Sequence, residues 1–175
     1  MATRLSYFLW NTTPDDALLD AAERGDLATF EGLKAQANRL LASDRSPEAA
    51  RTYFEEHLHL YALKRLRKDP TLFEHYYNEL GLDARDETLK LIEHIVFERE
   101  DDIRTLFTTR ETFLNPSLSS LYRVPSPTED GFGWVEYPEG HPRAGLLGQV
   151  SFLGLHSHAV SSSATLRGKA IRNLF

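Results

Sequence analysis

Four prolines in this chain each follow a residue that caps helices, and this pattern constrains the fold more than any other feature of the sequence. The side chains of Ser, Thr, Asp and Asn accept hydrogen bonds from the free N–H groups of a first helical turn, and proline is well tolerated at the first helical position. Each pair therefore predicts the start of a helix. The four pairs are Thr13-Pro14, Ser46-Pro47, Asp69-Pro70 and Asn115-Pro116.

Apolar residues recur at helical spacing after most of these pairs and in several further segments. The longest such pattern predicts a helix from Ala84 to about Arg99, capped by Asp83. The sum is an all-α fold, a single domain of about seven or eight helices. The other helices are expected over residues 14–24, 27–42, 46–58, from 69, from 116, over 144–155 and from about 164, with a short turn over 103–107.

The four remaining prolines lie together in a Pro/Gly-rich loop that we place at residues 123–142. Within this loop, residues 132–137 are compatible with a short strand or hairpin. Irregular segments of this length in a compact domain are usually functional or poorly ordered. The loop therefore separates a helical region, residues 1–122, from a C-terminal helical segment, residues 143–175.

Composition excludes several classes of site and partner. The chain has no cysteine, which excludes disulfides, thiolate zinc sites, iron–sulfur clusters and covalently attached haem within this segment. No membrane span or signal peptide is visible, and a net charge of −6 argues against a nucleic-acid partner. Met1 is the only methionine and the chain stops abruptly at Phe175, so we expect a fragment of a longer protein.

Charge is distributed unevenly along the chain. No acidic residue follows Glu139, whereas four cations do, and the net charge of −6 leaves −10 on residues 1–139. Such asymmetry indicates how parts of a protein dock or what they bind. We expect the cationic C-terminal segment to pack against the acidic helices. Its four cations are Arg143, Arg167, Lys169 and Arg172.

Two histidines in the C-terminal segment are candidate metal ligands. In extended backbone the imidazoles of His156 and His158 would share one side and reach one metal ion, whereas on a helix they would point apart. The alternative is structural, because a histidine at a helix C-terminus interacts favourably with the helix dipole. Both interpretations remain open from the sequence.

A serine triplet followed by two cations is a candidate anion site. Free N–H groups at a helix start favour negative charge, and cations one turn further on would add to this. Serine capping, with cations docked onto acidic helices, is the alternative. The residues concerned are Ser161, Ser162, Ser163, Arg167 and Lys169.

Several segments, in order along nearly the whole chain, resemble two adjacent domains of unknown function. These domains occur in large exported bacterial proteins of planctomycetes, myxobacteria and their relatives. The segments that carry the resemblance are Arg4–Asn11, Pro14–Asp16, Leu33–Gln36, Thr112–Asn115, Arg143–Leu147 and Leu166–Lys169.

The resemblance implies a place in a larger protein rather than an activity. It assigns residues 1–122 to the first domain and residues 143–175 to the start of the second, packed on the first as one unit. Parent proteins often carry a planctomycete-type cytochrome c domain. This implies export, neighbouring domains as partners, and a redox-linked or surface-degradation system whose c-type haem lies in a separate domain, with no cofactor in this fragment.

Two functions follow as hypotheses, and the sequence does not decide whether the chain is an enzyme. The first is a non-catalytic helical module that works through its neighbouring domains. The second is an enzymatic, metal-binding or anion-binding site under the Pro/Gly-rich loop. Its residues would be His156 and His158 together with the segment from Ser161 to Lys169.

Overall fold

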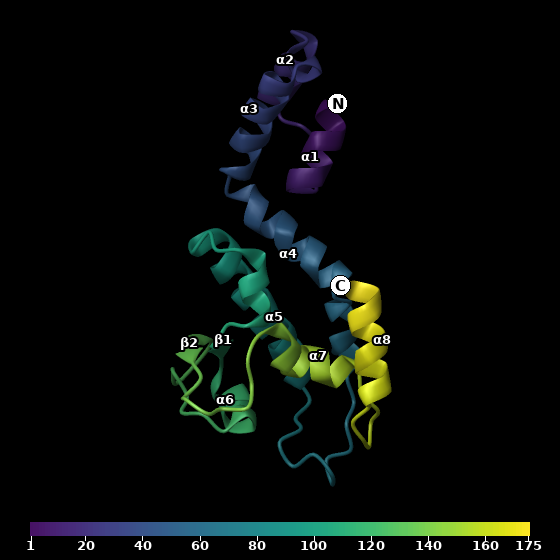
Figure 1. Cartoon of the computed structure of the whole chain (residues 1–175), viewed down its shortest axis with the longest axis vertical. Coiled ribbons are helices and arrows are strands. Elements are labelled where there is room, and N and C mark those ends of the chain that lie inside the picture. Colours follow the sequence, from purple (N-terminus) through teal and green to yellow (C-terminus); the bar gives the residue numbers. More distant parts are fainter. The chain divides into compact units, whose positions relative to one another are not determined.

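A computed structural model describes residues 1–175 and shows a mainly helical protein, which confirms the all-α prediction (Figure 1). Eight α-helices, shorter 3-10 and π segments and one two-stranded sheet make up the chain. The chain divides into two compact units: residues 1–53, here unit 1, and residues 54–175, here unit 2. The division lies inside helix α4 (Arg45–His57). No helix combines the length and the apolar character needed to cross a membrane.

Unit 1 contains the helices α1 (Ala2–Trp10), α2 (Asp16–Glu23) and α3 (Phe30–Leu41), a 3-10 turn (Asp26–Ala28) and most of α4. Its core includes Trp10, whose indole N–H donates to the carbonyl of Leu40 at 2.8 Å. Burial of this ring with a satisfied N–H joins α1 to the end of α3. The remaining core residues are Ala2, Leu18, Ala21, Leu27 and Leu40.

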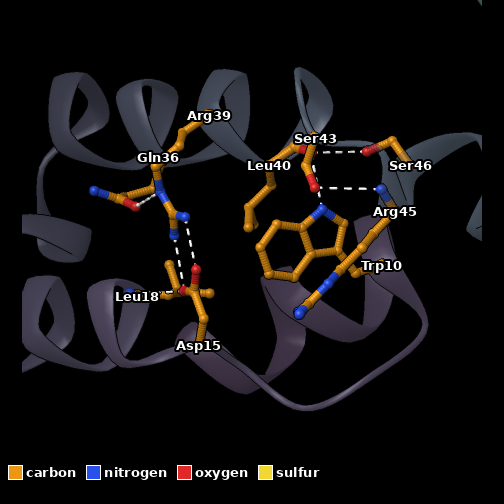
Figure 2. A network of polar contacts seen from close by, with 9 residues as sticks. All are labelled: Trp10, Asp15, Leu18, Gln36, Arg39, Leu40, Ser43, Arg45 and Ser46. Carbon is orange, nitrogen blue, oxygen red and sulfur yellow. Dashed lines mark hydrogen bonds and ion pairs between the residues drawn. The ribbon is translucent and has the colours of Figure 1, made fainter.

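A second polar link joins α2 to α3, and Figure 2 shows it beside the Trp10 contact. The carboxylate of Asp15 accepts the backbone N–H of Leu18 and two hydrogen bonds from the guanidinium of Arg39, at 2.7 and 2.9 Å. Asp15 therefore caps α2 and binds α3 with one side chain. Because of this, α2 begins two residues later than the Thr13-Pro14 pair predicts.

Ser46 also differs from its predicted role. α4 begins at Arg45, and the hydroxyl of Ser46 donates to the Leu40 carbonyl at 2.8 Å instead of capping its own helix. The apolar residues of α3 differ in burial: Leu40 is fully buried, whereas Phe30 is 74% exposed.

Unit 2 is built around the long helix α5 (Leu80–Glu93), which continues as a π turn (His94–Glu98). A core formed by Leu89, Leu91, Ile92 and their neighbours packs α5 against residues 58–66, and a second core packs its start against the sheet. The other elements are a 3-10 turn (Leu60–Arg65), a 3-10 turn (Ile103–Phe107), β1 (Glu111–Leu114), α6 (Pro116–Tyr122), β2 (Gly133–Glu136), a 3-10 turn (Leu146–Gly148), α7 (Val150–Leu155) and α8 (Ala164–Leu174).

The sheet of unit 2 pairs two segments that the sequence treats differently. β1 and β2 run antiparallel, with Thr112 opposite Val135 and Phe113 opposite Trp134. The strand within the Pro/Gly-rich loop is therefore confirmed. Its partner β1 was not predicted, although buried Thr112 and Leu114 alternate with half-buried neighbours as in a half-buried strand.

Three helix predictions in unit 2 need correction. Asp69-Pro70 begins no helix, because the carboxylate of Asp69 accepts the N–H and the hydroxyl of Thr71 and closes a local turn. α5 begins at Leu80 and not at Ala84, and Asp83 binds Tyr77 and Asn115 instead of capping. The helix expected over 144–155 is a 3-10 turn followed by α7.

Gly145 explains the break before α7. Its φ of +58° is left-handed, and a Cβ at this position would lie 2.3 Å from the carbonyl oxygen of Phe107. Its N–H donates to the Thr109 carbonyl at 2.8 Å. The absence of a side chain allows this close approach of backbone, and the approach fixes the C-terminal segment beside the turn at 103–107.

Candidate functional site

A pocket of about 480 Å³ lies within unit 2. Its walls come from the irregular segment 66–76, the end of α6, Arg143, α7 with the turn after it, and the start of α8. A volume of this size is typical of small-molecule sites. The polar and charged side chains that line it are Lys68, Glu74, His75, Tyr76, Arg123, Arg143, Ser157, Ser162 and Arg167.

Lys68 holds two walls of the pocket together. Its ammonium donates to the hydroxyl of Ser157 at 2.6 Å and to the carbonyl of His158 at 2.8 Å. The N–H of Asp69 donates to the carbonyl of Ala159 at 3.0 Å. Burial lowers the pKa of Lys68, and the ammonium has no carboxylate partner. Its positive charge is therefore offset only by neutral oxygen atoms.

Arg143 forms another wall and has a fixed position. Its guanidinium lies 4.5 Å from the centre of the Tyr122 ring and donates to the Gly148 carbonyl at 2.6 Å. A cation over an aromatic face is attracted by the ring and loses little freedom on binding a further group. Arg143 thus presents a pre-oriented positive charge to the pocket.

Two further arginines line the same pocket. Arg123 ends α6 in a left-handed conformation, with φ of +59°, and its side chain is exposed. Arg167 lies in the first turn of α8 and is half-buried. Neither guanidinium forms an ion pair in the structure. Glu74 is the one acidic residue of the lining, and it is exposed.

A buried hydrogen-bond network fixes the Tyr122 ring that Arg143 contacts. The carboxylate of Glu87, on α5, is fully buried and accepts hydrogen bonds from Tyr122 at 2.7 Å and from Thr112 at 2.8 Å. Burial raises the pKa of Glu87 to about 7, against these hydrogen bonds and the positive charge of Arg143. The network ties α5, β1 and α6 to the residue on which Arg143 lies.

The same network holds the start of α7. The N–H of Val150 donates to the Tyr122 hydroxyl at 2.8 Å, and the Gln149 side chain joins Thr112 to Thr88. Ser151 completes the chain at 2.6 Å from the Thr88 hydroxyl. The C-terminal segment therefore docks mainly through buried polar and apolar contacts.

Ion pairs contribute little to this docking. Of the four cations after Glu139, only Arg143 lies close enough to a buried carboxylate to affect its pKa. Arg167, Lys169 and Arg172 form no ion pair with the acidic helices. We expected opposite charges to hold the C-terminal segment against the acidic helices, and only Arg143 meets this expectation. The contact between this segment and the rest of unit 2 is buried and mostly neutral.

The structure separates the residues of the predicted anion site. Ser162 and Arg167 line the pocket. The hydroxyl of Ser163 accepts the N–H of Leu166 at 3.2 Å and caps α8, as the capping alternative predicts. Ser161 receives the N–H of His158 on its carbonyl, and Lys169 lies exposed outside the lining.

The two candidate metal ligands do not line this pocket. His156 ends α7, and its ring contacts Phe152 edge to face at 4.9 Å between centroids. Burial, with the nearby charge of His59, lowers the pKa of His156. No group of three or more His, Cys, Asp or Glu side chains suited to a metal ion occurs in the structure, so His156 and His158 gain no further ligand.

The sequence pointed to Arg167 as a site residue but not to the other three cations of the pocket. It also led us to expect that the Pro/Gly-rich loop would cover the site. Arg123 is the first residue of the Pro/Gly-rich loop and Arg143 directly follows the loop, but no residue between them lines the pocket. Lys68 ends the basic run from Lys64, a pattern that equally describes a solvated surface. No local signal indicates that these three residues meet.

Comparison with known proteins gives a family and no activity. A family described as PSD4, protein of unknown function (DUF1592), matches residues 1–124. No match was found among curated proteins or among solved structures. Because the family match covers more than two thirds of the sequence, the chain belongs to the PSD4 family of proteins of unknown function.

Proposed function

We propose that this chain is a non-catalytic binding module that holds an anionic group in the pocket of unit 2. The observation that carries the proposal is the convergence of four cationic side chains on one pocket without an ion-pair partner. They come from four separate parts of the chain: Lys68, Arg123, Arg143 and Arg167.

The electrostatics of the pocket support an anion over a neutral ligand. The chain as a whole carries −6, so a cluster of cations without carboxylate partners is a local exception. The four cations outnumber Glu74, the one acidic residue of the lining, and a cleft with an excess of one sign of charge concentrates ligands of the opposite sign. Guanidinium groups bind carboxylate and phosphate oxygens through paired, charge-assisted hydrogen bonds.

The wider setting of the module is a proposal that rests on the resemblance described above. On this ground we propose that the chain is part of a large exported bacterial protein, where it would lie beside neighbouring domains in a redox-linked or surface-degradation system. A c-type haem would belong to a separate domain. The family match supports a bacterial domain of unknown function.

Isothermal titration with citrate and inorganic phosphate tests the binding function. Low, constant ionic strength is needed because salt screens exposed charges. Arg123→Gln and Arg167→Gln should each weaken binding by at least about tenfold, since a hydrogen bond to a charged group contributes about 1.5–3 kcal/mol. Arg172→Gln and Lys169→Gln, outside the pocket, are matched controls and should change affinity less than twofold. Equal losses in both sets, or no binding by the wild type, would refute the proposal.

A further inference from the structure

We infer that the ligand of this pocket is an amphipathic acid, an anionic head on an apolar body several carbons long. This inference rests on the proposed function and names the class of ligand. It is carried by apolar side chains that line the same pocket as the cations. They are Leu66, Leu72, Phe73, Leu121, Val150 and Leu153.

The apolar part of the lining has a rigid base. Leu66 packs against both hydrophobic cores of unit 2, and Val150 is itself a core residue. Tyr76, also in the lining, donates its hydroxyl to the Leu66 carbonyl at 3.3 Å. The base of the pocket is therefore held in place by contacts that do not need a ligand.

The apolar rim is exposed instead. Leu72 is 60% exposed and Phe73 is 37% exposed, on adjacent positions of the segment that Asp69 closes into a turn. Hydrocarbon placed against them would remove apolar surface from water, which favours binding. An inorganic anion would use the cations and leave this surface wet.

The head group would meet charges whose positions are already set. Lys68 is held by Ser157 and His158, and Arg143 by Tyr122 and Gly148. Fixing these side chains before binding lowers the entropic cost of holding a carboxylate. The pocket volume of about 480 Å³ leaves room for a body beyond the head group.

A series of straight-chain acids tests this inference by titration calorimetry. Acetate, hexanoate and decanoate are compared with inorganic phosphate at one ionic strength, each below its aggregation threshold. Affinity should rise about two- to fourfold per added methylene until the pocket is filled, because burial of a methylene favours binding by that factor at most. Decanol, which has the body without the charge, should bind at least tenfold more weakly than decanoate.

Two double variants test whether the exposed apolar residues of the pocket cause the dependence of affinity on chain length. Leu72→Ser with Phe73→Ser should flatten the chain-length dependence and leave phosphate binding unchanged, and both positions are exposed enough to tolerate serine. Leu82→Ser with Ile103→Ser, exposed at 45% and 49% outside the lining, is the matched control and should keep the dependence.

The outcomes separate this inference from the proposed function. Phosphate binding that depends on Arg123 and Arg167, together with equal affinities for acetate and decanoate, would overturn the amphipathic ligand and keep the anion site. Absence of binding by every anion would overturn both.

Discussion

The hydroxyl of Tyr122 donates a hydrogen bond of 2.7 Å to the buried carboxylate of Glu87, while accepting the N–H of Val150 at 2.8 Å. One side chain thus joins α6, α5 and α7. Because Arg143 lies over the ring of Tyr122, this relationship also sets the position of a pocket cation. The first two predictions concern these residues.

Glu87→Gln should make the stability of unit 2 less dependent on pH. The folded protein raises the pKa of Glu87 from 4.5 to about 7, so it binds this proton more tightly than the unfolded chain does. The stabilisation is complete below pH 4.5, declines as pH rises toward 7 and is lost above it. At pH 8 the free energy of unfolding of Glu87→Gln should exceed that of the wild type by up to roughly 3 kcal/mol. Urea unfolding at several pH values measures this, and a difference that does not grow with pH would contradict it.

Tyr122→Phe should destabilise unit 2 by about 2–3 kcal/mol, because Val150 N–H and one Glu87 oxygen lose their buried partner. Tyr61→Phe is a suitable control, since Tyr61 is exposed and its hydroxyl lies a long 3.4 Å from His59. Thermal unfolding of the full chain compares the two. Similar losses in both variants would mean that the Tyr122 hydroxyl is not a structural link.

Two substitutions at Asp15 should separate its two roles in unit 1. Asn preserves a capping oxygen for Leu18 but loses the charge that pairs with Arg39, and this half-exposed pair should contribute under about 1 kcal/mol. Asp15→Ala loses both the capping oxygen and the ion pair, and it should lower the free energy of unfolding by about 1 kcal/mol more than Asp15→Asn does. Hydrogen exchange of α2 and α3 amides in the full chain reports the difference. Equal protection in the two variants would show that Asp15 does not cap.

Two glycine-to-alanine variants should change the free energy of unfolding in opposite directions. Gly145→Ala forces a Cβ within 2.3 Å of the Phe107 carbonyl at a left-handed position and should cost at least about 3 kcal/mol. Gly168→Ala adds a Cβ to open space inside α8 and should stabilise by about 0.5–1 kcal/mol. Chemical denaturation of both variants tests the pair, and a stable Gly145→Ala protein would contradict the close approach.

Local signals in the sequence were reliable where a cap and its helix are neighbours. Asn115 and Ser163 cap α6 and α8 as predicted, because each side chain bonds an N–H three residues on. Asp69 has the same signature, yet its carboxylate is taken by Thr71 and its N–H by Ala159, 90 positions along the chain. A contact at that distance overrides a local preference.

The candidate site was harder to predict for the same reason. Arg167 was singled out because it follows a serine cap, but Lys68 and Arg123 join it only through tertiary contacts of the segments 66–76 and α6. Glu87 lies in the predicted longest helix among charged neighbours, and nothing in its local sequence indicates full burial. The charge asymmetry correctly indicated that the C-terminal segment packs against the preceding helices. It wrongly indicated ion pairs, because this segment docks mainly through buried polar and apolar contacts.

Backbone amide chemical-shift mapping during titration with decanoate tests the central claim most directly. The account predicts saturable shifts at the pocket segments, 66–76, 121–123, 150–157 and 162–167, while amides of unit 1 stay unchanged. Arg167→Gln should weaken these shifts and Lys169→Gln should not. Shifts spread evenly over both units, or centred away from Lys68 and Arg143, would contradict an anion site in this pocket.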